Sequence, residues 1–137
     1  MLTLEQFKAA RATLQGVIRT TSLIHSPALS KACGNQVYLK PENMQVTGAY
    51  KIRGAYYKIS TLSEEEKARG LITASAGNHA QGLAYAAQAA GVPATIVMPT
   101  TTPLVKVNNT KDYGARVILH GEVFDEAAEK AAQLAEE

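Results

Sequence analysis

The side chain best placed for carbonyl chemistry is the amine of Lys51. Apolar residues recur at helical spacing after Gly48, which predicts a helix that begins near Ala49 with Thr47 as its N-cap. Lys51 then lies in the first turn, where the partial positive charge of the helix and the neighbouring Arg53 disfavour the ammonium form. A less protonated amine is the form that reacts with an aldehyde. The alternative is an ordinary solvated lysine beside the buried stripe of the helix.

A second stretch, residues 75–82, has the sequence SAGNHAQG and predicts an anion site. A strand is expected to end in a turn at Gly77, after which the free amides of a new helix point beyond the strand. Gly77 lets a ligand approach the backbone, and Ser75, Asn78 and His79 supply further donors. A carboxylate fits such a site. The alternative is a capping box, with Asn78 as N-cap and the glutamine three residues later, which needs no ligand.

Alternating helices and strands must position these side chains. The expected helices are 4–17, 28–33, 49–61, 63–70, 78–90, 102–114 (opened by Thr102 as cap before Pro103) and 123–137; the expected strands are 37–40, 71–74, 94–98 and 116–119. Strands that alternate with long helices predict parallel, right-handed crossovers, and the apolar strands predict a sheet covered on both faces. The fold class is therefore α/β, a parallel sheet layered with helices. Ligands bind beyond the carboxyl ends of such strands.

Composition narrows the function classes. The chain has 137 residues, 46% of them hydrophobic, and a net charge of +2 that comes from interspersed charges. This pattern gives no support for nucleic-acid or membrane binding, and the partner is expected to be a small molecule. The single cysteine, Cys33, excludes an intrachain disulfide and a cysteine-cluster metal site, and His25 and His120 lack metal-ligand spacing, so no metal is expected. The N-terminus carries no continuous hydrophobic segment, so we expect a cytoplasmic protein.

The two motifs together resemble those of the serine/threonine dehydratases. Residues 40–55, KPENMQVTGAYKIRGA, resemble the pyridoxal-phosphate attachment signature of that family, and residues 75–82 resemble its substrate-carboxylate loop. The resemblance extends through 97–99 and 114–121, so it covers nearly the whole chain. It implies the fold-type II, tryptophan-synthase-beta-like architecture. It is strongest for the threonine-deaminating members.

This resemblance implies a role for each motif residue. Lys51 would carry pyridoxal 5'-phosphate and remove the α-proton of the substrate, Tyr50 would pack against the pyridine ring, and Asn78 would bond the phenolic oxygen of the cofactor. The substrate carboxylate would be held by Ser75, Ala76, Gly77, Asn78 and His79. The implied reaction is the elimination of water from L-threonine, and possibly L-serine, to give 2-oxobutanoate (or pyruvate) and ammonia. The implied setting is isoleucine biosynthesis by a homo-oligomer.

Other activities remain open at this point. Racemases of the family are expected to have a serine where this chain has Ala76, which cannot exchange a proton, so elimination is favoured over serine racemisation. A cysteine-synthase-like β-replacement is a further enzymatic alternative. A non-catalytic ligand-binding or regulatory module, with the anion pocket but no attached cofactor, is the alternative from another class.

The implied domain organisation divides the chain near its first motif. Residues 1–46 are expected to belong to a larger catalytic domain, and residues 47–137 to form a small α/β domain. The last helix carries Glu136 and Glu137 where its dipole favours cations, and no stop signal follows. We therefore expect a fragment whose phosphate cradle lies beyond Glu137, and which alone binds the cofactor weakly and does not turn over.

Overall fold

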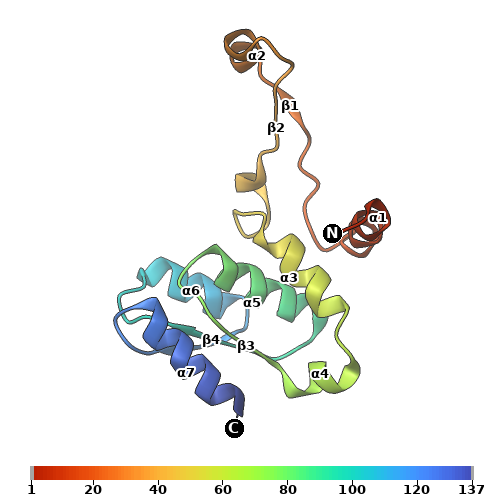
Figure 1. Cartoon of the computed structure of the whole chain (residues 1–137). Helices are drawn as coiled ribbons and strands as arrows, with labels where there is room; N and C mark the ends of the chain where they lie inside the picture. The colour runs from red at the N-terminus through yellow and green to blue at the C-terminus, as the bar shows by residue number, and fades with distance from the viewer. Residues whose placement is uncertain (1, 137) are drawn as a thin grey trace.

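A three-stranded parallel sheet forms the centre of the computed structural model, which describes residues 2–136 (Figure 1). Its strands are β3 (Leu71–Ala74), β4 (Ala94–Met98) and β5 (Arg116–Leu119), in the order β3-β4-β5. Thr73 lies opposite Ile96, which lies opposite Val117. The predicted α/β class, the parallel pairing and the bounds of all three strands are confirmed.

Helices cover both faces of the sheet (Figure 1). One face packs against α5 (Asn78–Ala90) and α6 (Leu104–Asp112), and the other against α7 (Phe124–Glu136). Helix α3 (Lys51–Ser60) packs on α5 and contributes side chains to the first core. Alternate residues of β4 point to opposite faces, so Ile96 and Met98 enter the first core and Val97 the second. All three side chains are fully buried. Apart from Thr95 the central strand is apolar, as expected for a strand that is covered on both faces.

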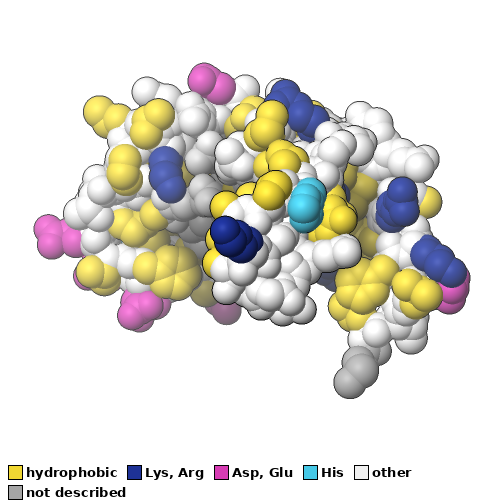
Figure 2. Space-filling model, turned by 90° about the horizontal axis from the view of Figure 1, so that it is seen from above, with side chains coloured by type: hydrophobic (Ala, Val, Ile, Leu, Met, Phe, Trp, Pro, Cys, Tyr) yellow, Lys and Arg dark blue, Asp and Glu magenta, His cyan; other side chains and the backbone are white. Residues whose placement is uncertain are grey.

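In the segment before α3, residues 24–39 project away from the sheet, whereas residues 4–13 lie beside α3 (Figure 1). The segment contains α1 (Leu4–Thr13), β1 (Ile24–His25), α2 (Pro27–Cys33), β2 (Tyr38–Leu39) and the 3₁₀ helix η1 (Glu42–Met44), with β1 antiparallel to β2. The expected helix 4–17 is too long, because the chain turns after Thr13 and Gly16 has a φ of 79°. Hydrophobic side chains remain exposed here, as Figure 2 shows for the face seen from above.

Residues 63–70 are rich in charged side chains and contain a short helix. The charged run forms α4 (Glu64–Arg69), with a capping box between Ser63 and Glu66 and Gly70 at its end, as expected for a short solvated helix. Within residues 2–136 no helix combines the length and apolar character that crossing a membrane requires.

The loop that leads into α3 differs from the prediction. Gly48 adopts a left-handed conformation, with a φ of 69°, which favours glycine. The Thr47 hydroxyl donates to the carbonyl of Ala49 at 3.3 Å, and Tyr50 occupies the N-cap position without a side-chain bond. Thr47 as N-cap is therefore wrong, and Lys51 is the first residue of α3.

An ion pair fixes η1 against the first turn of α3. Arg53 donates Nε–H to Glu42 Oε2 at 2.8 Å and Nη2–H to Glu42 Oε1 at 2.7 Å. The Thr21 hydroxyl donates to the same carboxylate at 2.6 Å. The Arg53 bonds, with support from Thr21, lower the pKa of Glu42 from 4.5 to about 2, and Glu42 raises the pKa of Arg53. Such bidentate, charge-assisted bonds hold the loop in one geometry.

Helix α5 approaches the start of α3 closely at Gly82. A Cβ on Gly82 would lie 3.1 Å from the backbone nitrogen of Ile52 and 3.2 Å from the Cβ of Lys51. These distances are shorter than ordinary van der Waals contact, so a side chain at residue 82 would require the backbone of α3 to shift by a few tenths of an ångström. The contact fixes the first turn of α3 relative to α5.

We expect Gly82→Ala to destabilise the fold. Overpacking a tight contact costs about 1–3 kcal/mol, whereas the higher helix propensity of alanine returns at most about 1 kcal/mol, so the free energy of unfolding should fall. Gly54→Ala is the matched control, because a Cβ there meets nothing within 4 Å; it should raise the free energy of unfolding by up to about 1 kcal/mol. Urea denaturation followed by circular dichroism measures both. Equal stabilisation by the two variants would contradict the close contact.

We expect the ion pair to make stability depend on acid pH. The folded pKa of Glu42, about 2, lies below its ordinary value of 4.5, so its contribution is complete above about pH 4.5 and is lost as the pH falls towards 2. Glu42→Gln should lower the free energy of unfolding by up to about 3 kcal/mol at pH 7 and by progressively less below pH 4.5. Glu65→Gln, at an exposed position, is the control. If the free energies of unfolding of Glu42→Gln and the unmodified chain differ by the same amount at every pH, the ionised Glu42 carboxylate is not the source of the stabilisation.

Candidate functional site

The turn between β3 and α5 lies at the carboxyl edge of the sheet, as predicted. Gly77 is the N-cap of α5 and Asn78 its first residue, and neither supplies a side-chain cap. The buried Ser75 hydroxyl takes that task, because it accepts from the amides of Ala80 at 3.2 Å and Gly77 at 3.4 Å. The capping-box alternative, with Asn78 as N-cap, is therefore wrong.

Several donors of this turn remain without a partner. Among residues 2–136 the backbone amides of Ala76, Asn78 and His79 find no hydrogen-bond acceptor. Asn78 and His79 are exposed, and Ala76 and Gly77 are partly exposed. Unpaired amides at the N-terminus of a 13-residue helix favour an anion, because the helix dipole and the N–H groups act in the same direction.

Lys51 lies on the same side of the sheet as this turn. Its Cβ lies 3.2 Å from the position that a Cβ on Gly82 of α5 would take. Its positive charge contributes to the lowered pKa of His79. Partial burial and the charge of Lys51 lower the pKa of His79 below its ordinary value of 6.5, so the imidazole is mostly neutral at pH 7. The structure thus brings together the two motifs on which the sequence interpretation depends.

The surroundings of Lys51 leave it accessible. Lys51 is exposed, and its Nζ lies 5.4 Å from the centre of the Tyr50 ring, which is itself 60% exposed. Arg53, predicted to add an uncompensated positive charge beside Lys51, is instead paired with Glu42. That part of the electrostatic prediction is wrong, because the carboxylate approaches from a loop that helical spacing does not reveal.

A second lysine reaches the turn from α6. A Cβ built on Gly77 would lie 4.0 Å from Nζ of Lys106, and no other atom of the described residues, apart from the chain neighbours of Gly77, comes that close. The φ of Gly77 is −135°, which other residues also adopt. A side chain at position 77 would therefore fit the backbone conformation, but it would occupy the open space between the turn and Lys106.

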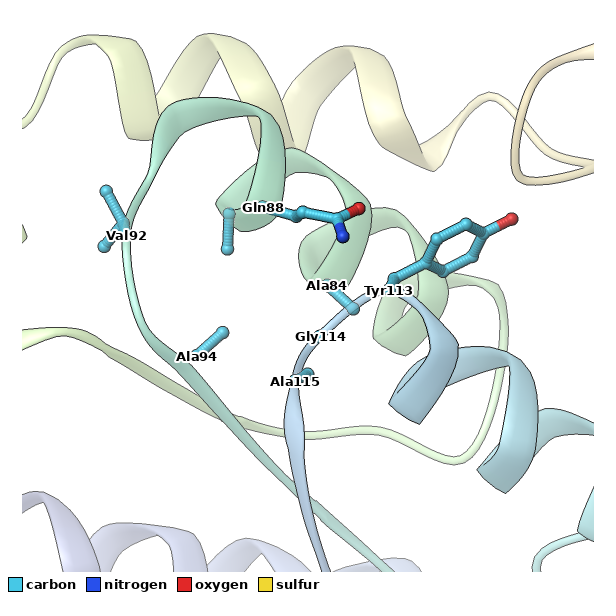
Figure 3. Close-up of a pocket in the computed structure, with 8 residues that line it drawn as sticks. Ala84, Gln88, Val92, Ala94, Tyr113, Gly114 and Ala115 are labelled. Carbon is cyan, nitrogen blue, oxygen red and sulfur yellow. The ribbon is translucent and has the colours of Figure 1, made fainter.

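Two pockets among residues 2–136 lie apart from the turn at Gly77 and from Lys51. A pocket of roughly 70 Å³, drawn in Figure 3, lies between the end of α5 and the starts of β4 and β5, where Gln88, Ala94 and Tyr113 line it. It is therefore at the amino edge of the sheet, opposite the turn at Gly77. A larger groove of roughly 930 Å³ runs between α1 and α3, beside Phe7 and Tyr57, and does not include Lys51.

The other two histidines lie apart from the turn at Gly77. His25 is on β1, where its Nε2 is 3.2 Å from Oγ of Ser30, and His120 follows β5. Within the described part of the chain no group of three His, Cys, Asp or Glu side chains could hold a metal ion.

Comparison with known proteins gives these motifs a context. A family described as pyridoxal-phosphate dependent enzyme matches residues 14–137. An L-threonine ammonia-lyase of Thermotoga maritima is 56% identical over 99% of this chain, which covers 34% of that protein. A catabolic L-threonine dehydratase of Staphylococcus aureus is 52% identical over the whole chain, which covers 40% of that protein. The chain therefore spans about a third to two fifths of the length of these curated relatives.

A solved structure of a racemase is similar in fold to this chain. The crystal structure of serine racemase from Dictyostelium discoideum superimposes with a TM-score of 0.90 at 35% identity, over 98% of this chain and 44% of that one. The expected fold-type II architecture is confirmed in the part that the chain covers. A match to the family over most of the chain, together with the shared fold, is decisive: the chain belongs to the family of pyridoxal-phosphate dependent enzymes.

Proposed function

We propose that the protein containing this chain deaminates L-threonine by eliminating water, and that L-serine is a secondary substrate. The observation that carries the proposal is the placement of the Lys51 amine on the same side of the sheet as the free amides of the turn at Gly77. A reactive amine beside a carboxylate site is what an enzyme that acts on the α-carbon of an amino acid requires. The identity to threonine-deaminating relatives supports the choice of substrate.

The residues present fit the cofactor of the family. Lys51 would attach it covalently, Tyr50 would cover one face of its ring, and Asn78, whose side chain has no hydrogen bond within residues 2–136, would bond its phenolic oxygen. Bound pyridoxal phosphate supplies an electron sink for negative charge at the α-carbon of the substrate. These three residues come from the first turns of α3 and α5 and the loop before α3.

The chain itself binds the substrate and moves one proton. The unpaired amides of Ala76, Asn78 and His79 hold the carboxylate, which fixes the α-carbon relative to Lys51. The freed amine of Lys51 removes the proton from the α-carbon, and the β-hydroxyl leaves as water. Water then replaces nitrogen in the released product, so that L-threonine gives 2-oxobutanoate and ammonia. Ala76 has no proton to return on the opposite face, which disfavours racemisation.

The preference between substrates, the assembly and the location of the enzyme are proposed as well. Threonine and serine differ by one methyl group, which a pocket distinguishes by only about 1–3 kcal/mol, so we propose a preference rather than exclusive use of threonine. We further propose a homo-oligomeric enzyme of the cytoplasm that serves isoleucine biosynthesis. The exposed free thiol of Cys33 supports a reducing compartment.

We also propose that residues 1–46 belong to a larger catalytic domain, and residues 47–137 to a small α/β domain. The support is the exposed apolar surface of the first segment. Leu4 and Phe7 of α1, Ile24 of β1 and Leu39 of β2 are each at least 46% exposed. A contiguous apolar groove of roughly 930 Å³ lies beside α1. Such a surface is typical of an interface with further protein.

Attachment of the cofactor at Lys51 has a direct test. We expect borohydride reduction of the protein loaded with pyridoxal phosphate to fix the pyridoxyl group on Lys51, as found by peptide mass spectrometry. Lys51→Ala should abolish the label, whereas Lys58→Ala, at an exposed lysine of the same helix, should retain it. Labelling of another lysine as the main product would refute the assignment, and no label at all would favour a non-catalytic module.

The reaction type has a separate test. With L-threonine the full-length protein should release equal amounts of 2-oxobutanoate and ammonia and form no D-amino acid. Ala76→Ser should introduce slow formation of D-serine from L-serine, because it adds an exchangeable proton next to the turn. D-serine as the main product of the unmodified protein would show a racemase instead. Consumption of sulfide with an activated serine would show β-replacement.

A further inference from the structure

Lys106 occupies a position that its helix does not favour. It is the third residue of α6, in the first turn, where the dipole disfavours a cation and no acidic residue is present. Its side chain is partly buried, and its Nζ lies 4.0 Å from where a Cβ of Gly77 would be. Lys106 therefore faces the turn at Gly77 directly.

The charge of Lys106 has no compensating group among the residues that the structure describes. Within residues 2–136, Nζ of Lys106 takes part in no ion pair and no hydrogen bond. The loop before α6 shows a second unpaired polar group, the hydroxyl of Thr102, which is buried and without a partner. Thr102 as the cap of α6 is therefore wrong, since Pro103 holds that position. A lysine in the first turn of a helix is unfavourable where no acidic residue offsets its charge, and an anionic ligand at the turn would supply the missing negative charge.

We infer that Lys106 is the charged contact for the substrate carboxylate, an assignment that rests on the proposed function. The amides of the turn are neutral donors, whereas the ammonium group of Lys106 adds a charge-assisted bond on the open side of Gly77. The two lysines then have different tasks. Lys51 acts at the reacting carbon, and Lys106 selects ligands that carry a negative charge at the turn. Lys106 therefore contributes to substrate binding and specificity and not to the chemical step.

A pair of ligands that differ only in this charge tests the inference. L-Alanine and L-alaninamide share the amino group and lack a leaving group, so their binding to the full-length holoenzyme can be followed through the absorbance of the cofactor. Lys106→Met should weaken L-alanine at least tenfold and L-alaninamide less than twofold, because it keeps the aliphatic stem and removes the charge. For L-threonine, KM should rise by a similar factor while kcat changes little.

Controls separate the charge from the fold. Lys111→Met, at an exposed lysine in the last turn of the same helix, should leave both affinities unchanged, and Lys106→Arg should restore most of the affinity for L-alanine. Equal weakening of both ligands, or unchanged affinity for L-alanine, in Lys106→Met would overturn the inference while the proposed function stands. If the unmodified holoenzyme responds to neither ligand and does not release 2-oxobutanoate from L-threonine, the proposed function itself fails, and this inference with it.

Discussion

The close approach of α5 to the first turn of α3 determines where the amine of Lys51 lies. Gly82 makes it possible, because any larger residue would meet the backbone of Lys51 and Ile52. Ile52 is fully buried immediately after the exposed Lys51, so packing into the core fixes the backbone from which the amine extends. An error of about 1 Å in such a position costs an enzyme about a hundredfold in rate. A helix-helix contact, rather than a flexible loop, is therefore what sets the distance between the amine and the turn at Gly77.

The ion pair between Glu42 and Arg53 restrains the same turn of α3 from the other side. Its two hydrogen bonds join residues eleven positions apart, and Thr21 adds a third from a still more distant segment. The carboxylate of Glu42 also compensates the positive charge of Arg53, two residues after Lys51. Packing on one side and a charged network on the other are the usual means by which a protein holds a functional group in one geometry.

The sequence predicted the sheet well and the helix N-caps poorly, for physical reasons. The strands 71–74, 94–98 and 116–119 are short apolar runs between glycine or proline signals, and such signals are local. The N-caps predicted at Thr47, Asn78 and Thr102 are all wrong, because a side-chain hydroxyl or amide can hydrogen-bond any of several nearby backbone groups. Ser75 shows the difficulty, since it bonds an amide five residues later. The motif residues at the turn were identified by resemblance, whereas Gly82 and the partner of Arg53 depend on contacts that no periodicity encodes.

A lysine in the first turn of a helix is unfavourable because the helix dipole disfavours a cation there. This chain has two such lysines, Lys51 and Lys106, and both lie on the side of the sheet where the turn at Gly77 is. Helices α5 and α6 follow adjacent parallel strands, so their N-termini reach the same edge of the sheet. Lys51 arrives there from a third helix through the contact at Gly82, and Lys106 lies against Gly77. A single amine could not serve both ends of an amino acid, because the group that takes a proton must lose its charge, whereas the group that holds a carboxylate must keep it. The difference in surroundings matches this division: Lys51 is exposed where a cofactor would reach it, and Lys106 is partly buried beside the donors of the turn.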